Sequence, residues 1–509
     1  MKIKEKIKNS DNSIERIVLE GIAAVIVIIA VALSIRMNME GHSLWWDEAA
    51  LADSFTNRSL LTLTSGALDN VQSAPVGWLY FVKILTLILG NNDFVLRIPA
   101  ILEFVGTLIL VYLILKRTFR VYYPMLGTAF VATLPIILQY SNIFKPYIAD
   151  CFFTLLTVWV YYCFKDKKHG FIKMGVIWAI LLWFSNPVCF MAGGIIASDF
   201  IFSVIRKNKD RAIQGVLGGV ILVASFVGDY FYWLRQTATD DSMLDFWKDW
   251  NLPLIPTSMA DILQYAKCAG TIFQQFYRLE YVIMILVAVC AAYALVKKDE
   301  LYLGIYGGFV VTVLASGLGM FPVNKRLWLF VYPLIVIVVA VGLDQLIKDT
   351  EVRSKPRAIL GLAVLLAVLL NGGIRYYINT DHIYWPRYEV KAGYNYICEN
   401  IEEDESVYVC NYQKTIFNYY NNYKQDELDG VGNPVYICQK HSKKYDYEED
   451  LDFIISSGKC YIMAGDGWED EEYMGRLKEG LAEAGYLQEV YNPYETPIYY
   501  FCVDEKDMK

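Results

Sequence analysis

Two carboxylates stand beside two tryptophans in the segment LWWDEAALAD, residues 44–53. A carboxylate such as Asp47 or Glu48 can act as a general base, because it can accept a proton from a reacting group. The segment follows the first long apolar run of the chain and so stands at the edge of the membrane. A charge in or near the membrane costs free energy, and such charges often mark a functional site. We therefore predict that these residues contribute to a site. The alternative is that both acids only stabilise a helix N-terminus beside an aromatic belt.

Charged and aromatic side chains recur in two later segments, YSNIFKPYIAD (140–150) and FPVNKRLWLF (321–330). Cations and hydroxyl groups of this kind can bind a phosphate, and a buried acid can organise a site. Each has a structural alternative, because Asp150 can cap the following helix and a single cation can anchor a helix end. The candidate residues of these segments are Lys145, Tyr147, Asp150, Lys325 and Arg326.

The apolar runs predict a polytopic α-helical membrane protein. The chain of 509 residues is 55% hydrophobic and 15% aromatic, and many of its apolar runs have the length of a transmembrane helix. Lys and Arg cluster between these runs, and such clusters mark cytoplasmic loops. Placing every cluster inside predicts a cytoplasmic N-terminus, an outer C-terminal tail and eleven spans, near residues 14–35, 95–115, 122–140, 149–164, 171–185, 187–205, 212–234, 279–296, 301–320, 327–346 and 358–377.

The segment PVGWLYFVKILTLILG (75–90) is apolar but is not counted as a span. It is short, contains Lys83, and as a span would place the cations of residues 116–120 outside. We predict a helix at the outer interface instead, so that the first outer loop carries two interfacial helices, the other beginning near Asp47. A protein of twelve spans remains the alternative.

The tail differs from the rest of the chain in charge and pattern. From residue 381 onward, 27 Asp and Glu stand against 12 Lys and Arg, a net charge of −15, while the preceding part has a net charge of +7. This balance argues against nucleic acid as a partner. Strand patterns at 406–410, 435–438, 459–465 and 497–503 alternate with helix patterns, without a GxGxxG or P-loop. We predict a membrane domain over 1–378 and a small extracytoplasmic α/β domain over 379–509.

The order of these features resembles that of GT-C-type glycosyltransferases. This family of polyprenyl-phosphate-sugar-dependent membrane enzymes includes protein O-mannosyltransferases and the lipid A aminoarabinose transferase. LWWDEAALAD is similar to the start of the family's first outer loop, and PVGWLYFVKILTLILGNNDFVLRIP to its P-x-x-Y/W helix followed by LR-x-P. YSNIFKPYIAD resembles its second outer loop, and NKRLWLFVYP its late Arg-containing helix. The resemblance covers roughly residues 14–350.

The resemblance implies an inverting transfer of a sugar from an undecaprenyl- or dolichyl-phosphate donor to an extracytoplasmic glycan, lipid or protein acceptor in the plasma membrane. By position in the family pattern, Asp47 is the expected general base and Glu48 the second choice. Asp150 matches the family's second acidic position. We expect Lys145, Lys325, Arg326 and, with less support, Tyr147 to bind the phosphate, and Trp46 to contact the sugar or the lipid phosphate.

The sequence departs from the family pattern at two places. Ser73 and Ala74 stand where aminoarabinose-type members carry a Lys, and Lys145 replaces the Arg often found before PY. The second loop contains one acid and no DxD, and the ten cysteines form no CxxC or clustered metal-binding pattern. We therefore predict that the protein uses no cofactor and no metal, although metal-using relatives leave a divalent cation open.

Three other functions compete with a transferase. A flippase or a polymerase of lipid-linked glycans is the nearest, but a polymerase usually holds arginines in a large late loop, and residues 235–278 are rich in Trp and acids instead. A transporter typically shows repeated halves and charges near the midplane, which this sequence lacks. A scaffold protein does not require Asp47, Asp150 and Arg326 together.

Overall fold

The computed structural model describes residues 2–276, 278–349, 354–370, 389–424, 426–438, 447–464, 471–493 and 496–509. The chain divides into two compact units. Unit 1 comprises Met1–Met39, Leu60–Ala67 and Ser73–Ile383, and unit 2 comprises Glu40–Ser59, Leu68–Gln72 and Tyr384–Lys509. The predicted domain boundary near residue 378 lies outside the described residues. Two pieces of the predicted first outer loop group with the tail, which the sequence did not indicate.

Unit 2 contains the predicted α/β fold around one sheet of five strands in the order β2-β1-β3-β5-β4. Strand β1 runs parallel to β2 and β3, whereas β5 runs antiparallel to β3 and β4. The strands are β1 (Ser406–Val409), β2 (Val435–Ile437), β3 (Lys459–Met463), β4 (Tyr486–Tyr491) and β5 (Ile498–Cys502). The α-helices are α2 (Trp46–Asn57), α20 (Val390–Asn400), α21 (Lys414–Tyr420), α22 (Glu448–Ser457) and α23 (Glu471–Ala484).

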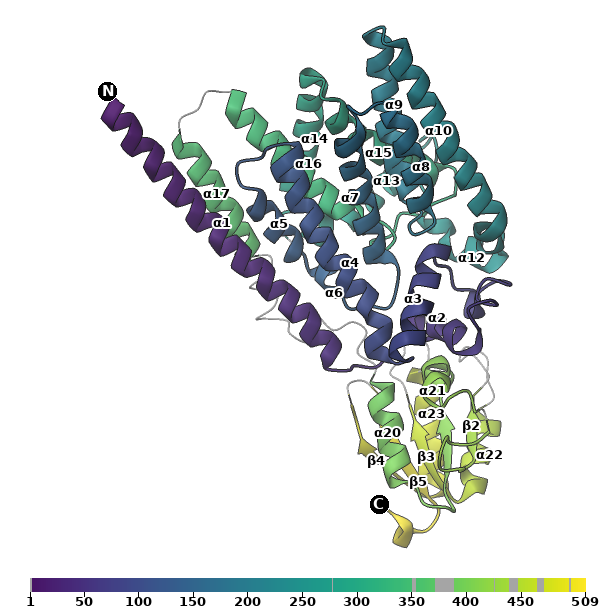
Figure 1. The fold of residues 1–509 in the computed structure, drawn as a ribbon. Coiled ribbons are helices and arrows are strands. Elements are labelled where there is room, and N and C mark those ends of the chain that lie inside the picture. The colour runs from purple at the N-terminus through teal and green to yellow at the C-terminus, as the bar shows by residue number, and fades with distance from the viewer. Residues whose placement is uncertain are drawn as a thin grey trace. The chain divides into compact units, whose positions relative to one another are not determined.

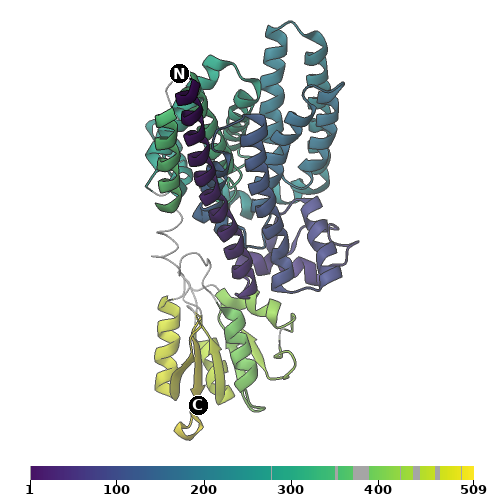
Figure 2. The same ribbon diagram turned by 60° about the vertical axis from the view of Figure 1, so that its left-hand side comes forward.

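Helices cover both faces of this sheet (Figure 2). On one face, Ile454 of α22 and Leu477 of α23 join a buried cluster with Tyr408 of β1 and Phe501 of β5. On the other face, α20 approaches so closely that a Cβ at Gly393 would lie 2.9 Å from the Ile498 side chain. The mostly buried strands β1, β3 and β5 therefore lie between helices on the two faces of the sheet, as buried strands require.

Unit 1 is a bundle of helices in which α1 runs alongside α5 and α17 (Figures 1 and 2). Asn92, Asn208 and Asp299 each accept a backbone N–H bond at the start of α4, α10 and α15, and so satisfy helix termini that have no intrahelical partner. The α-helices are α1 (Lys2–Met39), α3 (Val76–Leu89), α4 (Asp93–Leu113), α5 (Pro124–Ala132), α6 (Pro135–Tyr140), α7 (Tyr147–Phe164), α8 (Gly170–Leu182), α9 (Val188–Ile205), α10 (Lys209–Asp229), α11 (Arg235–Ala238), α12 (Asp241–Trp247), α13 (Met259–Phe273), α14 (Glu280–Lys297), α15 (Glu300–Gly317), α16 (Val331–Asp349) and α17 (Ser354–Val368).

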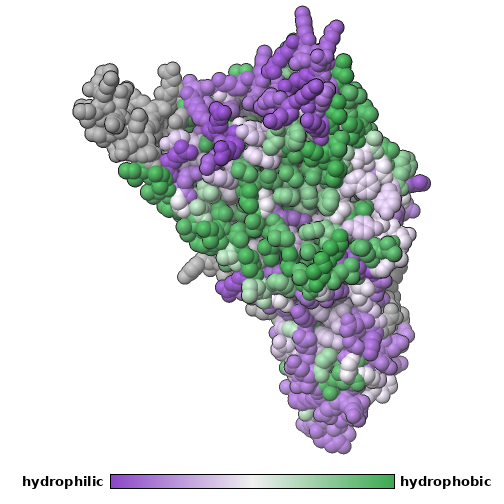
Figure 3. All heavy atoms as spheres, viewed as in Figure 1, coloured by the Kyte–Doolittle hydropathy of each residue, from purple (hydrophilic) through white to green (hydrophobic). Residues whose placement is uncertain are grey.

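Among the described residues, eight helices are long and apolar enough to cross a membrane. Three shorter helices, α3, α8 and part of α17, are apolar as well. Figure 3 shows a broad band of hydrophobic side chains over unit 1. The predicted polytopic helical fold is confirmed, while the number of spans stays a prediction. The predicted helix over 75–90 is present as α3, and its position at a membrane interface likewise stays a prediction.

The predicted span over 122–140 is interrupted. Helix α5 ends at Ala132 and α6 begins at Pro135. Proline lacks a backbone N–H, and its ring disfavours helical geometry in the residue before it. The last predicted span, 358–377, is described only to residue 370. The loop predicted between the spans 212–234 and 279–296 contains the 15-residue helix α13, which the sequence analysis did not predict.

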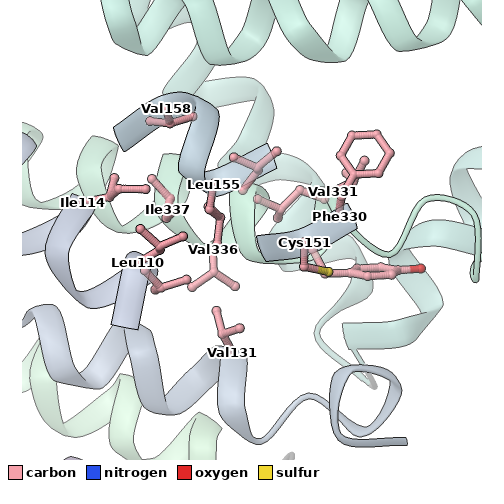
Figure 4. Close-up of a cluster of buried hydrophobic side chains, with 14 of the residues drawn as sticks. Leu110, Ile114, Val131, Cys151, Leu155, Val158, Phe330, Val331, Val336 and Ile337 are labelled. Carbon is pink, nitrogen blue, oxygen red and sulfur yellow. The ribbon is translucent and has the colours of Figure 1, made fainter. Parts of the chain in front are cut away.

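Aliphatic side chains from several helices fill the interior of unit 1 (Figure 4). Leu110 of α4, Val131 of α5 and Leu155 of α7 meet Val336 and Ile337 of α16, and all five are buried. Helices that share such a core are held in fixed relative positions, because close-packed interiors leave few voids. This core fixes α7 and α4, which carry the buried acids described below.

Helices α9 and α15 pack at close range through glycines. A Cβ at Gly194 would collide with the backbone of Gly307 and Gly308 on α15, whereas a Cβ at the adjacent Gly193 would meet nothing within 4 Å. Small residues at a helix interface let two backbones approach, which is typical of helices packed in membranes. Gly194 is therefore required by packing and Gly193 is not.

We expect Gly194→Ala to lower the free energy of unfolding by about 2–3 kcal/mol, because the new methyl group meets backbone that cannot move aside. Gly193→Ala should leave stability unchanged or raise it by up to about 1 kcal/mol, since alanine favours a helix. Thermal unfolding of both variants in one detergent measures the difference. Equal unfolding temperatures for the two variants would contradict the packing described here.

Candidate active site

The first acidic motif forms the N-terminus of α2 in unit 2. Glu48 is 1% exposed, and its Oε2 accepts a hydrogen bond from the backbone N–H of Trp45 at 3.2 Å. This bond satisfies a donor at the start of the helix, and acids in a first turn interact favourably with the helix dipole. Asp47 is half-buried and Trp46 is 38% exposed. Glu48 therefore fits the alternative that an acid of this segment stabilises the helix N-terminus, because one of its oxygens caps the helix.

The segment before α2 is fastened to the tail portion of unit 2 by hydrogen bonds. The carboxylate of Glu389 bonds His42 Nδ1 at 2.6 Å and accepts from the backbone N–H of Ser43 at 3.2 Å. The Tyr420 hydroxyl accepts from the backbone N–H of Leu44 at 2.8 Å. A motif that follows the first helix of unit 1 in sequence thus belongs structurally to unit 2, through residues more than 340 positions away.

A second set of bonds holds the far end of α2. Asp69 accepts from the Ser54 hydroxyl at 3.1 Å and pairs with Arg58 at 2.8 Å. Asn70 donates to Asp53 at 3.2 Å, and burial raises the pKa of Asp53 above its ordinary value. The position of Asp47 on α2 is therefore set by polar contacts at both ends of the helix.

In unit 1, the structure surrounds Asp150 with polar groups inside an apolar bundle. Asp150 lies in the first turn of α7 and is 8% exposed, and its Oδ1 accepts a hydrogen bond from Ser185 at 2.7 Å. The residue before α7 is Pro146, so the alternative that Asp150 is the N-cap is wrong. Glu103 of α4, 7% exposed, interacts electrostatically with Asp150 and with the indole of Trp78. Its Oε2 has no hydrogen-bond partner among the described residues.

The sequence analysis missed Glu103, although a signal was available. It is the one acid in the apolar stretch IPAILEFVGTLIL, and an ionisable residue inside a transmembrane segment indicates a functional site. Two carboxylates buried in one apolar bundle cost free energy that a purely structural role does not explain. We therefore add Glu103 to the candidate residues.

The turn before α7 positions the candidate phosphate ligands of the second segment. Lys145 is 4% exposed and Tyr147 is half-buried against the Tyr140 ring, with centroids 5.3 Å apart. Phe144 stacks on Trp78 at 5.5 Å. The structure thus brings Lys145, Tyr147 and Asp150 together in one tightly packed segment.

Lys325 and Arg326 lie in the turn before α16. The guanidinium carbon of Arg326 stands 5.5 Å from the centroid of the Trp247 ring, a cation–π contact with α12. Its backbone N–H donates to Asn324 Oδ1 at 3.1 Å. Lys325 is exposed. Arg326 is therefore held in place by an aromatic ring, which pre-orients a guanidinium that can bind a phosphate with two N–H groups.

Among the described residues, no group of three or more His, Cys, Asp or Glu side chains is placed to hold a metal ion. Asp150 and Glu103 form a pair, and the carboxylates of α2 belong to the other unit. The expectation that the protein needs no metal stays a prediction.

Part of unit 1 matches a known protein family. Residues 73–247 match the family model described as dolichyl-phosphate-mannose-protein mannosyltransferase. The matched segment extends from α3 to the end of α12 and includes Glu103, Lys145 and Asp150. No curated protein sequence matches the chain.

Solved structures share the fold at low sequence identity. The archaeal oligosaccharyltransferase AglB from Archaeoglobus fulgidus, in complex with an inhibitory peptide and a dolichol-phosphate, aligns with a TM-score of 0.50 and 12% identity over 96% of this chain and 75% of that chain. The apo form of the oligosaccharyltransferase from the same organism gives 0.51 and 10% identity over 87% and 69%. ArnT from Cupriavidus metallidurans in the apo state gives 0.39 and 8% identity over 94% and 98%.

These matches confirm the resemblance to GT-C-type glycosyltransferases. The chain is a multi-pass membrane protein with the fold of these enzymes, and its residues 73–247 carry the sequence pattern of the protein mannosyltransferase family.

The bond between His42 and Glu389 generates a pH-dependent prediction. This hydrogen bond raises the pKa of His42 above its ordinary value. The bond therefore stabilises the folded protein fully at pH values below about 6.5, the pKa of histidine in the unfolded chain. This stabilisation is lost as the pH rises through the higher pKa of His42 in the folded protein. We expect His42→Gln to speed amide hydrogen exchange in residues 40–57 by about fivefold at pH 5.5, which corresponds to a loss of about 1 kcal/mol of stabilisation from this bond. At pH 8.5 the exchange rate should change by much less.

Hydrogen-exchange mass spectrometry of the full chain measures this effect, with wild type and variant compared at each pH. His169→Gln, a change at an exposed histidine of unit 1, is the matched control and should leave residues 40–57 unchanged. An equal effect of His42→Gln at both pH values would contradict a contribution from the charged imidazole.

Proposed function

We propose that this chain is a membrane glycosyltransferase that moves a sugar from a polyprenyl-phosphate donor to an extracytoplasmic acceptor, with inversion at the anomeric carbon. The observation that carries the proposal is the family match over residues 73–247, which includes the buried pair of Glu103 and Asp150 and the Lys145 turn. The dolichol-phosphate bound to AglB, whose fold this chain shares, supports a lipid-phosphate donor.

An inverting transfer needs a base and a stabilised leaving group. The acceptor oxygen attacks the anomeric carbon on the face opposite the phosphate, the bond between that carbon and the phosphate oxygen breaks, and the acceptor proton passes to a carboxylate. We assign Asp47 as this base. Glu48 is the weaker candidate, because one of its oxygens already accepts the Trp45 N–H and the side chain is buried.

The departing lipid phosphate carries negative charge that cations and donors must stabilise. We assign Arg326 and Lys145 to this role, because Trp247 orients the first and close packing fixes the second. Tyr147, half-buried beside Asp150 in the same helix turn, is a further donor. Lys325 is exposed and can contribute charge with less precise orientation. Trp46 presents an exposed indole on which a sugar can stack.

We assign the buried pair of Asp150 and Glu103 to organising the phosphate ligands rather than to proton transfer. Asp150 is tied to Ser185, which connects α7 to the turn before α9. With Lys145 and Tyr147 five and three residues away in the same segment, the position of α7 sets the positions of both. The acceptor is a glycan, a lipid or a protein. Unit 2 either binds this acceptor or serves as an accessory fold.

Separate substitutions of Asp47 and Glu48 by their amides test which of the two residues is the base. We expect Asp47→Asn to lower the turnover number by about 10²–10⁴-fold, because an amide cannot accept the proton. Glu48→Gln should retain activity within about tenfold, since a glutamine oxygen can still accept the Trp45 N–H. The measurement is release of radiolabelled sugar from undecaprenyl-phosphate donors by the purified protein in nanodiscs.

Binding of the same labelled donors, measured in parallel, is the control and should be equal in wild type and Asp47→Asn. Full activity of Asp47→Asn would refute Asp47 as the base, and loss of activity in Glu48→Gln alone would transfer the role to Glu48. Wild type that binds the donors and releases no sugar, in the presence of lipid, glycan and peptide acceptors, would contradict the proposed function.

Chelation tests the expectation that no metal takes part. We expect turnover to persist in an excess of EDTA, because the second-loop segment supplies one acid, Asp150, and no DxD pair. Activity that EDTA abolishes and manganese restores would show the expectation to be wrong and would assign the buried acids a metal-binding role.

A further inference from the structure

A polar cavity of about 580 Å³ lies in unit 1 away from Asp150. It forms where α7, α14 and α16 end and where α10 and α15 begin. Asp150 stands in the first turn of α7, whereas the cavity-lining Lys165 follows its last residue, so about 22 Å of helix separates them at 1.5 Å per residue. None of the residues proposed for sugar transfer lines this cavity.

The floor of the cavity is a preformed network of ion pairs. Arg211 Nε donates to both oxygens of Asp199, at 2.9 and 3.1 Å, and its Nη2 pairs with Glu300 at 3.0 Å. The Tyr161 hydroxyl donates to Glu300 at 3.3 Å, and Arg206 pairs with the same carboxylate. These carboxylates are therefore matched by the two guanidinium groups and do not leave negative charge for a cation to bind.

The walls combine paired and unpaired cations. Six cationic side chains and four carboxylates line the cavity, and Asp199 and Asp344, outside the lining, pair with Arg211 and Lys348, so that carboxylates and cations balance. Lys297 is paired with Asp349 at 2.6 Å. Lys165 and Lys298 form no ion pair with any of the described residues. The cationic residues are Lys165, Arg206, Arg211, Lys297, Lys298 and Lys348.

Position relative to the cavity distinguishes Lys165 and Lys298 from ordinary basic anchors at helix ends. Lys168, Lys209 and Lys298 are all exposed, but Lys168 and Lys209 lie outside the cavity. Lys165 and Lys298 line a shared hollow large enough for a small ligand. In Figure 3, hydrophilic side chains gather beyond the hydrophobic band of unit 1, over the connection between α9 and α10. Basic pockets between membrane helices are typical sites for anionic lipid head groups.

We propose that this cavity binds the phosphate group of an anionic ligand, either a phospholipid head group or free phosphate. Lys165 and Lys298 supply ammonium groups that lie outside the ion pairs, and Arg206 at the rim supplies planar N–H donors. The ion-pair network below them keeps the binding groups in place before the ligand arrives. This proposal is independent of the function assigned to Asp47.

The test compares lipid retention by the purified full chain in native mass spectrometry. Dioctanoyl phosphatidylglycerol and dioctanoyl phosphatidylcholine are offered at equal concentration, and we expect at least fivefold more bound phosphatidylglycerol. The double variant Lys165→Gln/Lys298→Gln should lose this preference. Lys168→Gln/Lys209→Gln removes the same charge outside the cavity and should retain it. Thermal unfolding of both variants verifies that they fold.

Inorganic phosphate separates the two sources of the ligand. If millimolar phosphate raises the unfolding temperature of wild type but not of Lys165→Gln/Lys298→Gln, and displaces phosphatidylglycerol, the cavity binds free phosphate. If phosphate has no effect while the lipid preference holds, the ligand is a head group. Equal retention of both lipids with no effect of phosphate would overturn the proposal, as would a double variant that behaves like wild type.

Discussion

Apolar surroundings make an ionised side chain costly unless a partner compensates it, and unit 1 meets this constraint in two different ways. At the helix ends around Glu300, carboxylates are matched by Arg206 and Arg211. At Asp150, which accepts a hydrogen bond from Ser185, a second buried carboxylate, Glu103, interacts electrostatically, and no cation among the described residues takes part in the interactions of either acid. In the first arrangement, charges of opposite sign compensate one another. The second costs stability, which is why we interpret it as functional.

The cost of burying a charge without a partner also separates the roles of Asp47 and Glu48 in unit 2. Both stand in the first turn of α2, but Glu48 is buried and caps the helix, whereas Asp47 remains half-buried. The helix itself is positioned by Glu389 and Tyr420 at its start and by Asp69 further along. The base that we propose, Asp47, must be held where it meets the acceptor, and its position depends on contacts within unit 2. This dependence gives the tail a structural role whether or not it binds an acceptor.

Much of the fold could be predicted, because apolar runs and basic loops are local patterns. The alternation of strands and helices in the tail was predicted for β1, β2, β3 and β5, whose side chains are mostly buried. Strand β4 was missed because its sequence YLQEVY is largely exposed at a sheet edge. The attachment of residues 40–59 to the tail could not be predicted, because it depends on contacts such as His42 with Glu389, which no local pattern encodes. Glu103 was visible in its apolar run, but its nearness to Asp150 comes from the packing of α4 on α7.

The most direct test of the central claim is the configuration of the anomeric carbon in the product. The purified protein in nanodiscs would receive undecaprenyl-phosphate sugars of known configuration, with nuclear magnetic resonance of the transferred sugar as the readout. A single displacement assisted by one carboxylate predicts a product of inverted configuration. A product of retained configuration would require a covalent intermediate on the protein and would contradict the role assigned to Asp47.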